Sequence, residues 1–453
     1  MRARTLPPSR LRSSGGTPIA RRAAVLAAVA ALGAGLLTGC ADDGKGAAGS
    51  PDGGSGGGRT TLTLGLFGTM GFKEAGLYTA YEKLHPDIRI QENVTERNEN
   101  YYPALVNHLT TNSGLMDVQA VEVGNIAEVV NTQAAKLADV SKAPGVDKSA
   151  WLDWKWQQAT TQDGRTVGLG TDIGPMAICY RKDLFRKAGL PTDREAVGRL
   201  WAGDWSKLVA AGEAYKKKAP QGTSFMDSPG GLINAILSSE KDRFYDSSGK
   251  VVYKTNPAVR KAFDLTAKAA QEGLVQSQTQ FQPSWDQTIA NSRFATVACP
   301  PWMLGYLKGK SKADAAGKWD VAAAPRSGNW GGTFLTVPAG GRHVKQAEAF
   351  IAWLTAPAQQ AKLFAVQGSF PSAPAAYDLP AVTGAKNAMT GDAPIGRIFA
   401  AAAKAIPVQP IGPKDQIIQQ GLTDNGVILV TKGKSADEAW RTATKTIDNN
   451  LEQ

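Results

Sequence analysis

The sequence predicts an α/β protein built as two lobes. Its 453 residues are enough for two domains of about 200 residues each. Apolar residues recur with the period of a strand and then with the period of a helix, in alternating segments, which is typical of strands connected by helices. A composition of 42% hydrophobic and 20% charged residues is ordinary for a soluble protein.

The alternation begins at residue 59, where RTTLTLGLFG alternates leucine with threonine and glycine, as a strand does. A helical segment follows and ends at His85, because the residue before a proline disfavours the helical conformation. We expect Gly114 to end the next helix. The predicted elements are strand 59–68, helix 77–84, strand 87–94, helix 102–114 and strand 116–123. This order favours a parallel sheet with flanking helices.

The same alternation continues to the C-terminus. Pro257 is favoured at the first position of a helix, and Ser435 with Glu438 forms a capping box before the last helix. Strands are predicted at 167–170, 176–180, 294–299 and 331–338, and helices at 183–189, 256–273, 347–354 and 435–447. Ligands bind beyond the carboxyl ends of strands in open α/β sheets, so we expect a binding site at such ends.

One tryptophan follows two prolines where a predicted strand ends. In TVACPPWM, Pro300 and Pro301 stop strand pairing and fix the backbone, so Trp302 is held on a rigid corner. Burial in the core is the ordinary explanation for such a tryptophan. Presentation of a flat ring to a ligand is the alternative, and other segments of the chain favour it.

Residues 1–39 have the pattern of an export signal. Six arginines without an acidic residue accompany an apolar core over 23–37, which is too short and too rich in alanine for a membrane span. LTGC, ending at Cys40, resembles the lipobox of bacterial lipoproteins; this implies an exported protein, lipid-anchored on the outer face of the cytoplasmic membrane. The arginine pair at 21–22 leaves twin-arginine export open. We expect residues 40–59, rich in glycine, to be a flexible tether.

The net charge of +11 does not predict a nucleic-acid partner. The six arginines before Cys40 account for much of it, so the rest of the chain carries +5 with interspersed charges. The three histidines are far apart and share no ligand spacing, so we expect no metal and no cofactor. Cys179 and Cys299 either form a disulfide or stay buried thiols, and the sequence leaves both open.

A resemblance to the family 1 extracellular solute-binding proteins of ABC importers runs in order from Thr60 to the C-terminus. CYRKDLFRKAGLPTD is similar to that family's tyrosine–basic–Lys-Asp-Leu-Phe–Ala-Gly segment. RFATVACPPWM resembles its strand with a proline–tryptophan turn, and NWGGTFLTVPAGG resembles its glycine hinge. VTKGKSADEAWRTATKTIDNNL resembles its closing helix.

This resemblance implies a two-lobed periplasmic-binding-protein fold, like that of maltose-binding protein, with crossover hinge strands and a ligand cleft between the lobes. The hinges are expected near 168–174, near 330–336 and after Pro371. The implied lobes are residues 60–170 with 335–378, and residues 171–334 with 379–453.

The candidate ligand residues follow from the chemistry of a sugar, which has apolar C–H faces and a rim of hydroxyls. Trp302 matches the family's stacking tryptophan; core packing is the alternative for every aromatic candidate. Asp172 either binds a hydroxyl or caps a turn, and Asn125 either binds a hydroxyl or caps the next helix. The predicted set is Trp302, Trp285, Trp330, Asp172, Glu122, Asn125, Phe370, Phe67 and Gly68, with Asp227 and Asp286 as further candidates.

The leading functional hypothesis is the substrate-binding lipoprotein of an ABC sugar importer. We expect a monomer without catalytic activity that captures a di- or oligosaccharide and delivers it to the membrane permease subunits. An α-glucoside and a cello-oligosaccharide are both compatible with the sequence. One alternative is a lipid-anchored secreted polysaccharide hydrolase, because the carboxylate pairs of glycosidases have no fixed sequence spacing. A surface adhesin is the other alternative.

Overall fold

The computed structural model describes residues 58–452, all of which belong to one compact unit, Gly57–Gln453. The predicted export signal, the lipidation site Cys40 and all but the last two residues of the predicted tether lie outside the described residues. Among the described residues, no helix combines the length and the apolar character that crossing a lipid bilayer requires.

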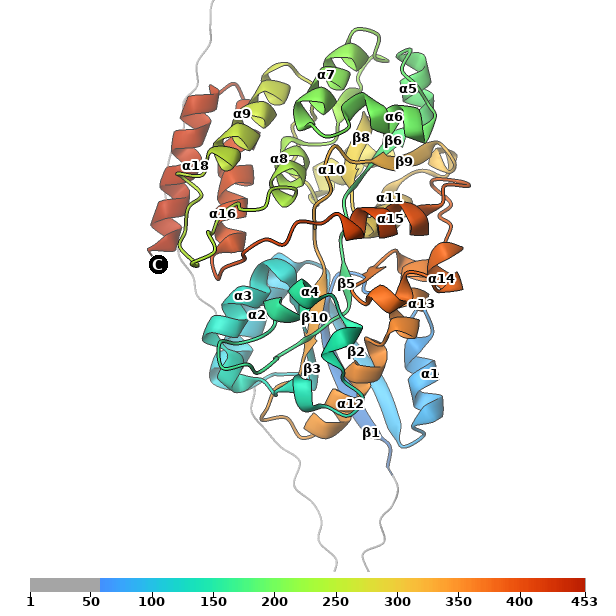
Figure 1. Ribbon diagram of the computed structural model, residues 1–453, viewed down its shortest axis with the longest axis vertical. Coiled ribbons are helices and arrows are strands. Elements are labelled where there is room, and N and C mark those ends of the chain that lie inside the picture. Colours follow the sequence, from blue (N-terminus) through green and yellow to red (C-terminus); the bar gives the residue numbers. More distant parts are fainter. Residues whose placement is uncertain (1–57, 453) are drawn as a thin grey trace, which may run out of the picture. The chain divides into compact units, whose positions relative to one another are not determined.

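The first sheet has five strands in the order β2-β1-β3-β10-β4; β1, β2, β3 and β10 are labelled in Figure 1. β1 runs parallel to β2 and β3, as the sequence predicts, whereas β10 is antiparallel to β3 and β4. The expectation of a parallel sheet is therefore wrong for the sheet as a whole, because the chain enters β10 from a second sheet. The strands are β1 Thr60–Phe67, β2 Ile88–Thr95, β3 Val118–Glu122, β4 Leu169–Gly170 and β10 Thr333–Thr336.

Helices cover this sheet because its strands present alternating apolar side chains. Leu62, Leu64 and Leu66 of β1 are buried and share one core with α1 and α12. Tyr81 of α1 meets Phe350 of α12 edge to face, with ring centroids 4.8 Å apart. The helices of this part are α1 Leu77–Leu84, α2 Asn98–Thr111, α3 Val123–Thr132, α4 Asp153–Gln158, α12 Val344–Leu354 and α13 Pro357–Gln367.

One helix end differs from the prediction. α2 ends at Thr111 and its C-cap, Asn112, adopts the left-handed conformation with φ of 52°. Asparagine tolerates this conformation better than most residues, so the helix stops before Gly114, the residue we expected to end it.

The second sheet has four strands in the order β7-β8-β6-β9. β6 is antiparallel to β8 and β9, and β7 is parallel to β8. Cys179 of β6 and Cys299 of β8 are both buried and form a disulfide, with Cα atoms 5.4 Å apart. This settles the alternative that the sequence left open. The strands are β6 Ala177–Arg181, β7 Ser224–Met226, β8 Phe294–Cys299 and β9 Trp319–Ala323.

The remaining helices pack around the second sheet. The predicted capping box is confirmed: the Ser435 side chain accepts from the Glu438 amide, and the Glu438 side chain accepts from the Ser435 amide. The helices are α5 Lys182–Lys187, α6 Arg194–Trp201, α7 Trp205–Lys216, α8 Pro229–Ser238, α9 Pro257–Gln271, α10 Pro283–Ala290, α11 Pro301–Lys310, α14 Pro380–Thr383, α15 Ile395–Lys404, α16 Asp415–Leu422, α17 Ile428–Val430 and α18 Ala436–Leu451.

The chain crosses between the sheets along segments that contact one another. One crossover leads from β4 through β5 (Asp172–Ile173) to β6, and another leads from β9 to β10. The Trp330 amide donates to the Gly174 carbonyl oxygen at 2.8 Å. A Cβ atom on Gly174 would lie 1.7 Å from the Trp330 carbonyl oxygen, so only glycine allows this approach. β11 (Phe370–Pro371) pairs with β5 beside them.

Two sheets, each with its own helices and core, thus form the two lobes of the fold. The lobe boundaries that the sequence suggested stay a prediction.

Candidate ligand-binding site

Trp302 lies in the first turn of a helix. Pro300 is the N-cap of α11 and Pro301 is its first residue, so the prolines begin a helix as well as ending the strand. The half-buried Trp302 indole donates from Nε1 to the Trp330 carbonyl oxygen at 2.9 Å. The Trp302 and Trp330 rings are perpendicular, with centroids 5.7 Å apart. The structure therefore brings two of the predicted tryptophans together.

Asp172, on β5 of the other crossover, is hydrogen-bonded to the chain segment that follows Trp330. The Thr333 amide donates to Asp172 Oδ1 at 2.9 Å, and the Thr171 hydroxyl donates to the same oxygen at 2.6 Å. Asp172 thus fixes one crossover to the other, and its side chain is only 8% exposed. Oδ1 accepts from another crossover and not from a turn, so neither the ligand role nor the turn-capping role that the sequence left open for Asp172 is established.

Glu122 lies on the other side of the same crossover. It is the register partner of Thr333 in the β3–β10 pairing, and the amide of the next residue donates to the Gly332 carbonyl oxygen at 2.9 Å. Glu122 is also the N-cap of α3, because its Oε2 accepts from the Gly124 amide at 2.5 Å. A Cβ on Gly124 would lie 2.5 Å from the Gln416 amide oxygen, so α16 of the second lobe reaches this point.

Asn125 lies in the first turn of α3 and does not cap it. The cap is Glu122, so the capping role considered for Asn125 is wrong. Asn125 Oδ1 accepts from the Asn98 amide of α2 at 2.9 Å. This hydrogen bond places a pair of side-chain amides next to Glu122.

Phe67 and Gly68 end β1, as expected. Phe67 is half-buried and packs against Tyr101 of α2, with centroids 5.7 Å apart. The Gly68 amide donates to the Thr95 carbonyl oxygen at 2.9 Å, at the end of β2. Both predicted residues therefore lie where two parallel strands end together.

A contact between the lobes links this edge to the tryptophan pair. Arg97, which follows β2, donates from Nη1 to the Gln282 amide oxygen at 3.0 Å. Gln282 follows Phe281, whose ring centroid lies 6.1 Å from that of Trp302. The strand-end residues of the first lobe and the aromatic residues of the second are thus joined by successive contacts.

Two predicted aromatic residues have no exposed surface. Trp285 is 0% exposed and donates from Nε1 to Asp227 Oδ2 at 3.0 Å. Phe370 is 0% exposed and packs against Tyr377 and Phe364. Both side chains are core residues in this structure, as the alternative reading of each allowed.

The structure adds Lys155, which the sequence analysis missed. It comes from α4, is 0% exposed, and has no hydrogen-bond partner for Nζ among the described residues. The only sequence signal was one lysine among the tryptophans of WLDWKW. A charged residue inside an apolar segment of a helix is a reason to look for a buried charge cluster.

The charged side chains around the crossover have shifted pKa values. Burial raises the pKa of Glu122 to about 7, and the Gly124 amide and the Lys155 ammonium oppose this rise. Burial also raises the pKa of Asp172, again opposed by Lys155. Burial lowers the pKa of Lys155 to about 8, although both carboxylates favour its charged form. Burial therefore favours the neutral form of each group, whereas the attraction between the lysine and the acids favours the charged forms.

Asp227 is a second buried carboxylate. Its Oδ2 accepts from the Gln280 amide at 2.7 Å and from Trp285, and its Oδ1 has no partner among the described residues. Burial raises the pKa of Asp227 to about 7. Asp286, the other further candidate, accepts from the Tyr306 hydroxyl at 2.6 Å and pairs with Lys310.

The shifted pKa of Asp227 predicts how stability depends on pH. A carboxyl group whose pKa is raised in the folded state stabilises the fold below its unfolded pKa of about 3.9, and this contribution is lost as pH rises through about 7. We expect the melting temperature of the ligand-free protein to fall by at least about 2 °C between about pH 5 and about pH 8. Asp227→Asn should reduce this fall, and differential scanning calorimetry measures it.

The exposed Asp378 provides the matched control, because Asp378→Asn removes an equal charge without touching a buried group. An Asp227→Asn variant with the same pH slope as Asp378→Asn would contradict the assignment of a raised pKa to Asp227.

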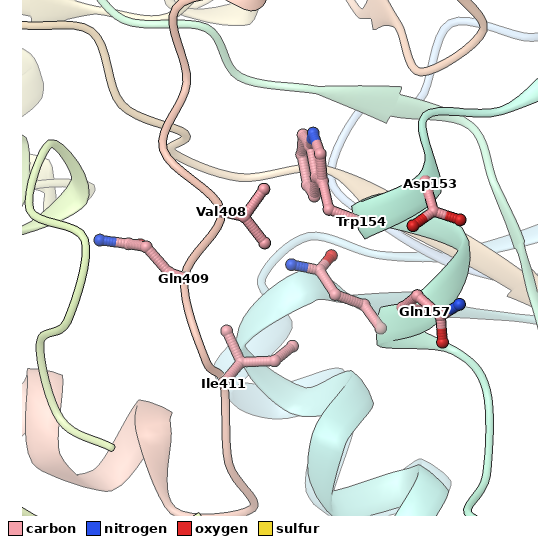
Figure 2. Close-up of a pocket in the computed structure, with 7 residues that line it drawn as sticks. Asp153, Trp154, Gln157, Val408, Gln409 and Ile411 are labelled. Carbon is pink, nitrogen blue, oxygen red and sulfur yellow. The ribbon is translucent and has the colours of Figure 1, made fainter. Parts of the chain in front are cut away.

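A separate cavity of about 380 Å³ lies between α4 and residues 408–411 (Figure 2). None of the predicted site residues lines it. Figure 2 shows the Trp154 ring, Val408 and Ile411 around one space. The complete lining is Asp153, Trp154, Gln157, Gln158, Val408, Gln409 and Ile411.

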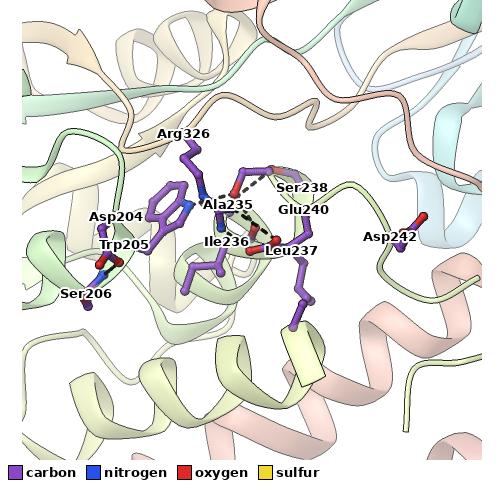
Figure 3. A network of polar contacts seen from close by, with 12 residues as sticks. Asp204, Trp205, Ser206, Ala235, Ile236, Leu237, Ser238, Glu240, Asp242 and Arg326 are labelled. Carbon is purple, nitrogen blue, oxygen red and sulfur yellow. Dashed lines mark hydrogen bonds and ion pairs between the residues drawn. The ribbon is translucent and has the colours of Figure 1, made fainter. Parts of the chain in front are cut away.

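A polar network fixes one wall of this cavity. Gln409 donates from Nε2 to the Leu237 carbonyl oxygen at 2.9 Å, at the C-terminal end of α8. Figure 3 shows the rest of the network, in which Arg326 pairs with Glu240 and Trp205 points toward the end of the same helix. Among residues 58–452, no group of three or more His, Cys, Asp or Glu side chains is arranged to hold a metal ion.

Comparison with known proteins gives consistent matches. The model of the bacterial extracellular solute-binding protein family matches residues 76–391. A lactose-binding protein of Rhizobium radiobacter is 26% identical over 183 residues, which is 40% of this chain and 41% of that protein. An arabinooligosaccharide-binding protein of Bacillus subtilis (strain 168) is 23% identical over 290 residues, 60% of this chain and 64% of that protein. The chain thus spans less than two thirds of either curated relative.

A solved structure is similar to this chain as well. It is described as an extracellular solute-binding protein of family 1 and is 37% identical to this chain. The superposition has a TM-score of 0.77 and covers 86% of this chain and 99% of the other.

Proposed function

Because the chain belongs to the bacterial extracellular solute-binding proteins, we propose that it is the sugar-binding lipoprotein of an ABC importer. In this proposal the protein captures a di- or oligosaccharide by closure of its two lobes and delivers it to the membrane permease. The relatives matched are named as solute-binding proteins, which supports a binding protein rather than a hydrolase.

One observation carries the proposal of a sugar ligand. The half-buried Trp302 and Trp330 rings lie beside the crossover that leads to β10, and Thr333 at the start of β10 donates to the Asp172 carboxylate and is the register partner of Glu122. Aromatic rings cover the C–H faces of a sugar, and carboxylates accept from its hydroxyls in charge-assisted hydrogen bonds. The names of the curated relatives, for lactose and for arabinooligosaccharides, support the same class of ligand.

The proposed ligand residues follow from this arrangement. Trp302 and Trp330 would contact the sugar faces, and Glu122 and Asn125 would contact hydroxyls. Phe67 and Gly68 would border the ligand at the end of β1. Asp172 would accept from a sugar hydroxyl through Oδ2, because Oδ1 already accepts from the Thr333 amide and the Thr171 hydroxyl.

A thermal-shift screen with di- to tetrasaccharides tests the proposal. The panel contains α-glucosides, cello-oligosaccharides, lactose and arabinooligosaccharides. At a ligand concentration about 100-fold above Kd, binding adds about 2.7 kcal/mol to stability, which raises the melting temperature by several degrees. Chromatography of the same samples should detect no product. Release of product would favour a hydrolase, and the absence of any shift across the panel would contradict the proposed ligand class.

Membrane attachment rests in this proposal on Cys40. We expect Cys40→Ser to release the protein into the medium, because lipid on that one thiol would hold it at the membrane. Cell fractionation followed by immunoblotting measures the distribution. A variant that stays with membranes after a high-salt wash would contradict lipid anchoring, and wild-type protein provides the reference.

A further inference from the structure

Lys155 is inserted from α4 beneath the two crossovers. Its Nζ lies 3.7 Å from the ring centroid of Phe334 on β10. A Cβ on Gly332 would lie 2.9 Å from Nζ, and a Cβ on Gly170 would lie 2.9 Å from both Cγ and Cε. Each crossover thus has a glycine where the lysine passes, and any larger residue would collide with it.

A buried ammonium without hydrogen bonds is costly, so its surroundings must favour the charge. The ring of Phe334 provides one favourable contact. The carboxylates of Glu122 and Asp172 form no hydrogen bond with Nζ, but their charges favour the charged form of Lys155 at longer range. Thr333 connects the two acids, as the register partner of Glu122 and a hydrogen-bond donor to Asp172.

We propose that Lys155 is a positioning residue of the sugar site: its buried ammonium, held beneath the two crossovers, favours the ionised carboxylates of Glu122 and Asp172, which would accept hydrogen bonds from sugar hydroxyls. This inference rests on the proposed function. An ionised carboxylate only accepts hydrogen bonds, and its bonds to hydroxyls are stronger than those of a neutral acid. Lys155 would act on the ligand through these two acids.

The charges near Glu122 and Asp172 define how the protonation of these two acids should change when Lys155 is replaced. The charges of Lys155 and Arg243 lower the pKa of Glu122 and that of Asp172 raises it, and the charge of Lys155 lowers the pKa of Asp172. Arg243 is itself paired with Asp415 of α16. Removal of the Lys155 charge takes away a group that lowers the pKa of both acids, so both should be protonated at higher pH than in the wild type.

The test is calorimetric titration of Lys155→Met across pH with the sugar that binds wild-type protein best in the screen. Sugar affinity should fall as pH decreases and the two acids become protonated. We expect this fall to occur about one pH unit higher in Lys155→Met than in wild type. At a pH where affinity is already falling with acidification, the variant should bind about tenfold more weakly than wild type. A shift of one pH unit there is about a tenfold change in the ionised fraction of the acids. Lys155→Gln is a second neutral replacement with the same expected shift, should the methionine variant not fold.

Two further variants separate the proposed role from a merely structural one. Lys142→Met removes a side chain that is 83% exposed and should leave the pH profile unchanged. In a Glu122→Gln background, Lys155→Met should cause a smaller shift, because one of the two acids through which it acts is gone.

The outcomes distinguish this inference from the proposed function. Failure of every sugar to bind wild-type protein would reject the proposed function. Binding by wild type with an unshifted pH profile in a folded Lys155 variant would overturn the role of Lys155. An equal shift with and without Glu122→Gln would also overturn it.

Discussion

Trp302→Ala should abolish most sugar binding while leaving the protein folded. The indole is half-buried, stands perpendicular to Trp330 and donates to its carbonyl oxygen. Loss of one buried aromatic contact at a binding site typically costs about 2–4 kcal/mol. Each 1.4 kcal/mol is about tenfold in Kd, so affinity should weaken by roughly 30- to 1,000-fold. Calorimetric titration and a melting curve on the same variant measure both quantities.

The matched control for Trp302 is Trp154, another half-buried tryptophan, which lines the separate cavity. Trp154→Ala should retain much more affinity than Trp302→Ala. If instead Trp154→Ala is the damaging change, the sugar lies in the cavity beside residues 408–411. Near-native affinity together with a collapsed melting temperature for Trp302→Ala would make Trp302 a core residue, since removal of a packed tryptophan costs about 3–5 kcal/mol of stability.

Gly174→Ala should damage both stability and binding. A Cβ there would lie 1.7 Å from the Trp330 carbonyl oxygen, so the two crossovers would have to separate. That oxygen also accepts from Trp302, so the change displaces the tryptophan pair. Overpacking typically costs about 1–3 kcal/mol, and a collision with backbone has few ways to relax. We expect the melting temperature to fall by several degrees and sugar affinity to weaken by at least about tenfold.

Gly309→Ala is the matched control for Gly174→Ala. Gly309 lies in α11 and a Cβ there would meet no atom within 4 Å, so alanine should be neutral or stabilising. Calorimetry compares the two variants under identical conditions. A Gly174→Ala variant as stable as Gly309→Ala would contradict the contact between the crossovers.

Local patterns explain which parts of the fold the sequence predicts well. The alternation of Leu62, Leu64 and Leu66 identifies a strand because one face of β1 packs into a core. The capping box of Ser435 and Glu438 marks the start of α18 because both hydrogen bonds are local. Each of these signals depends only on residues a few positions apart.

Other features of the fold depend on residues far apart in the chain. β10 lies antiparallel between β3 and β4 because the crossover brings the chain into the sheet from the opposite end. No local sequence pattern predicts this direction. The disulfide joins residues with a sequence separation of 120, so spacing alone left it open.

The candidate site also depends on residues that are far apart in the chain. Trp302 and Trp285 are both tryptophans near prolines, yet one is half-buried and the other is 0% exposed. The sequence could not separate them, because the direction of a side chain depends on the packing of its helix. Lys155 escaped prediction because its partners come from β3, β5 and β10, which are distant along the chain.

A crystal structure with the tightest-binding sugar from the screen tests the central claim most directly. We expect a sugar ring against the Trp302 indole, with a hydroxyl within hydrogen-bond distance of the Glu122 carboxylate. A sugar bound in the cavity beside Trp154 instead, with no contact to Trp302 or Glu122, would show that the ligand site lies elsewhere.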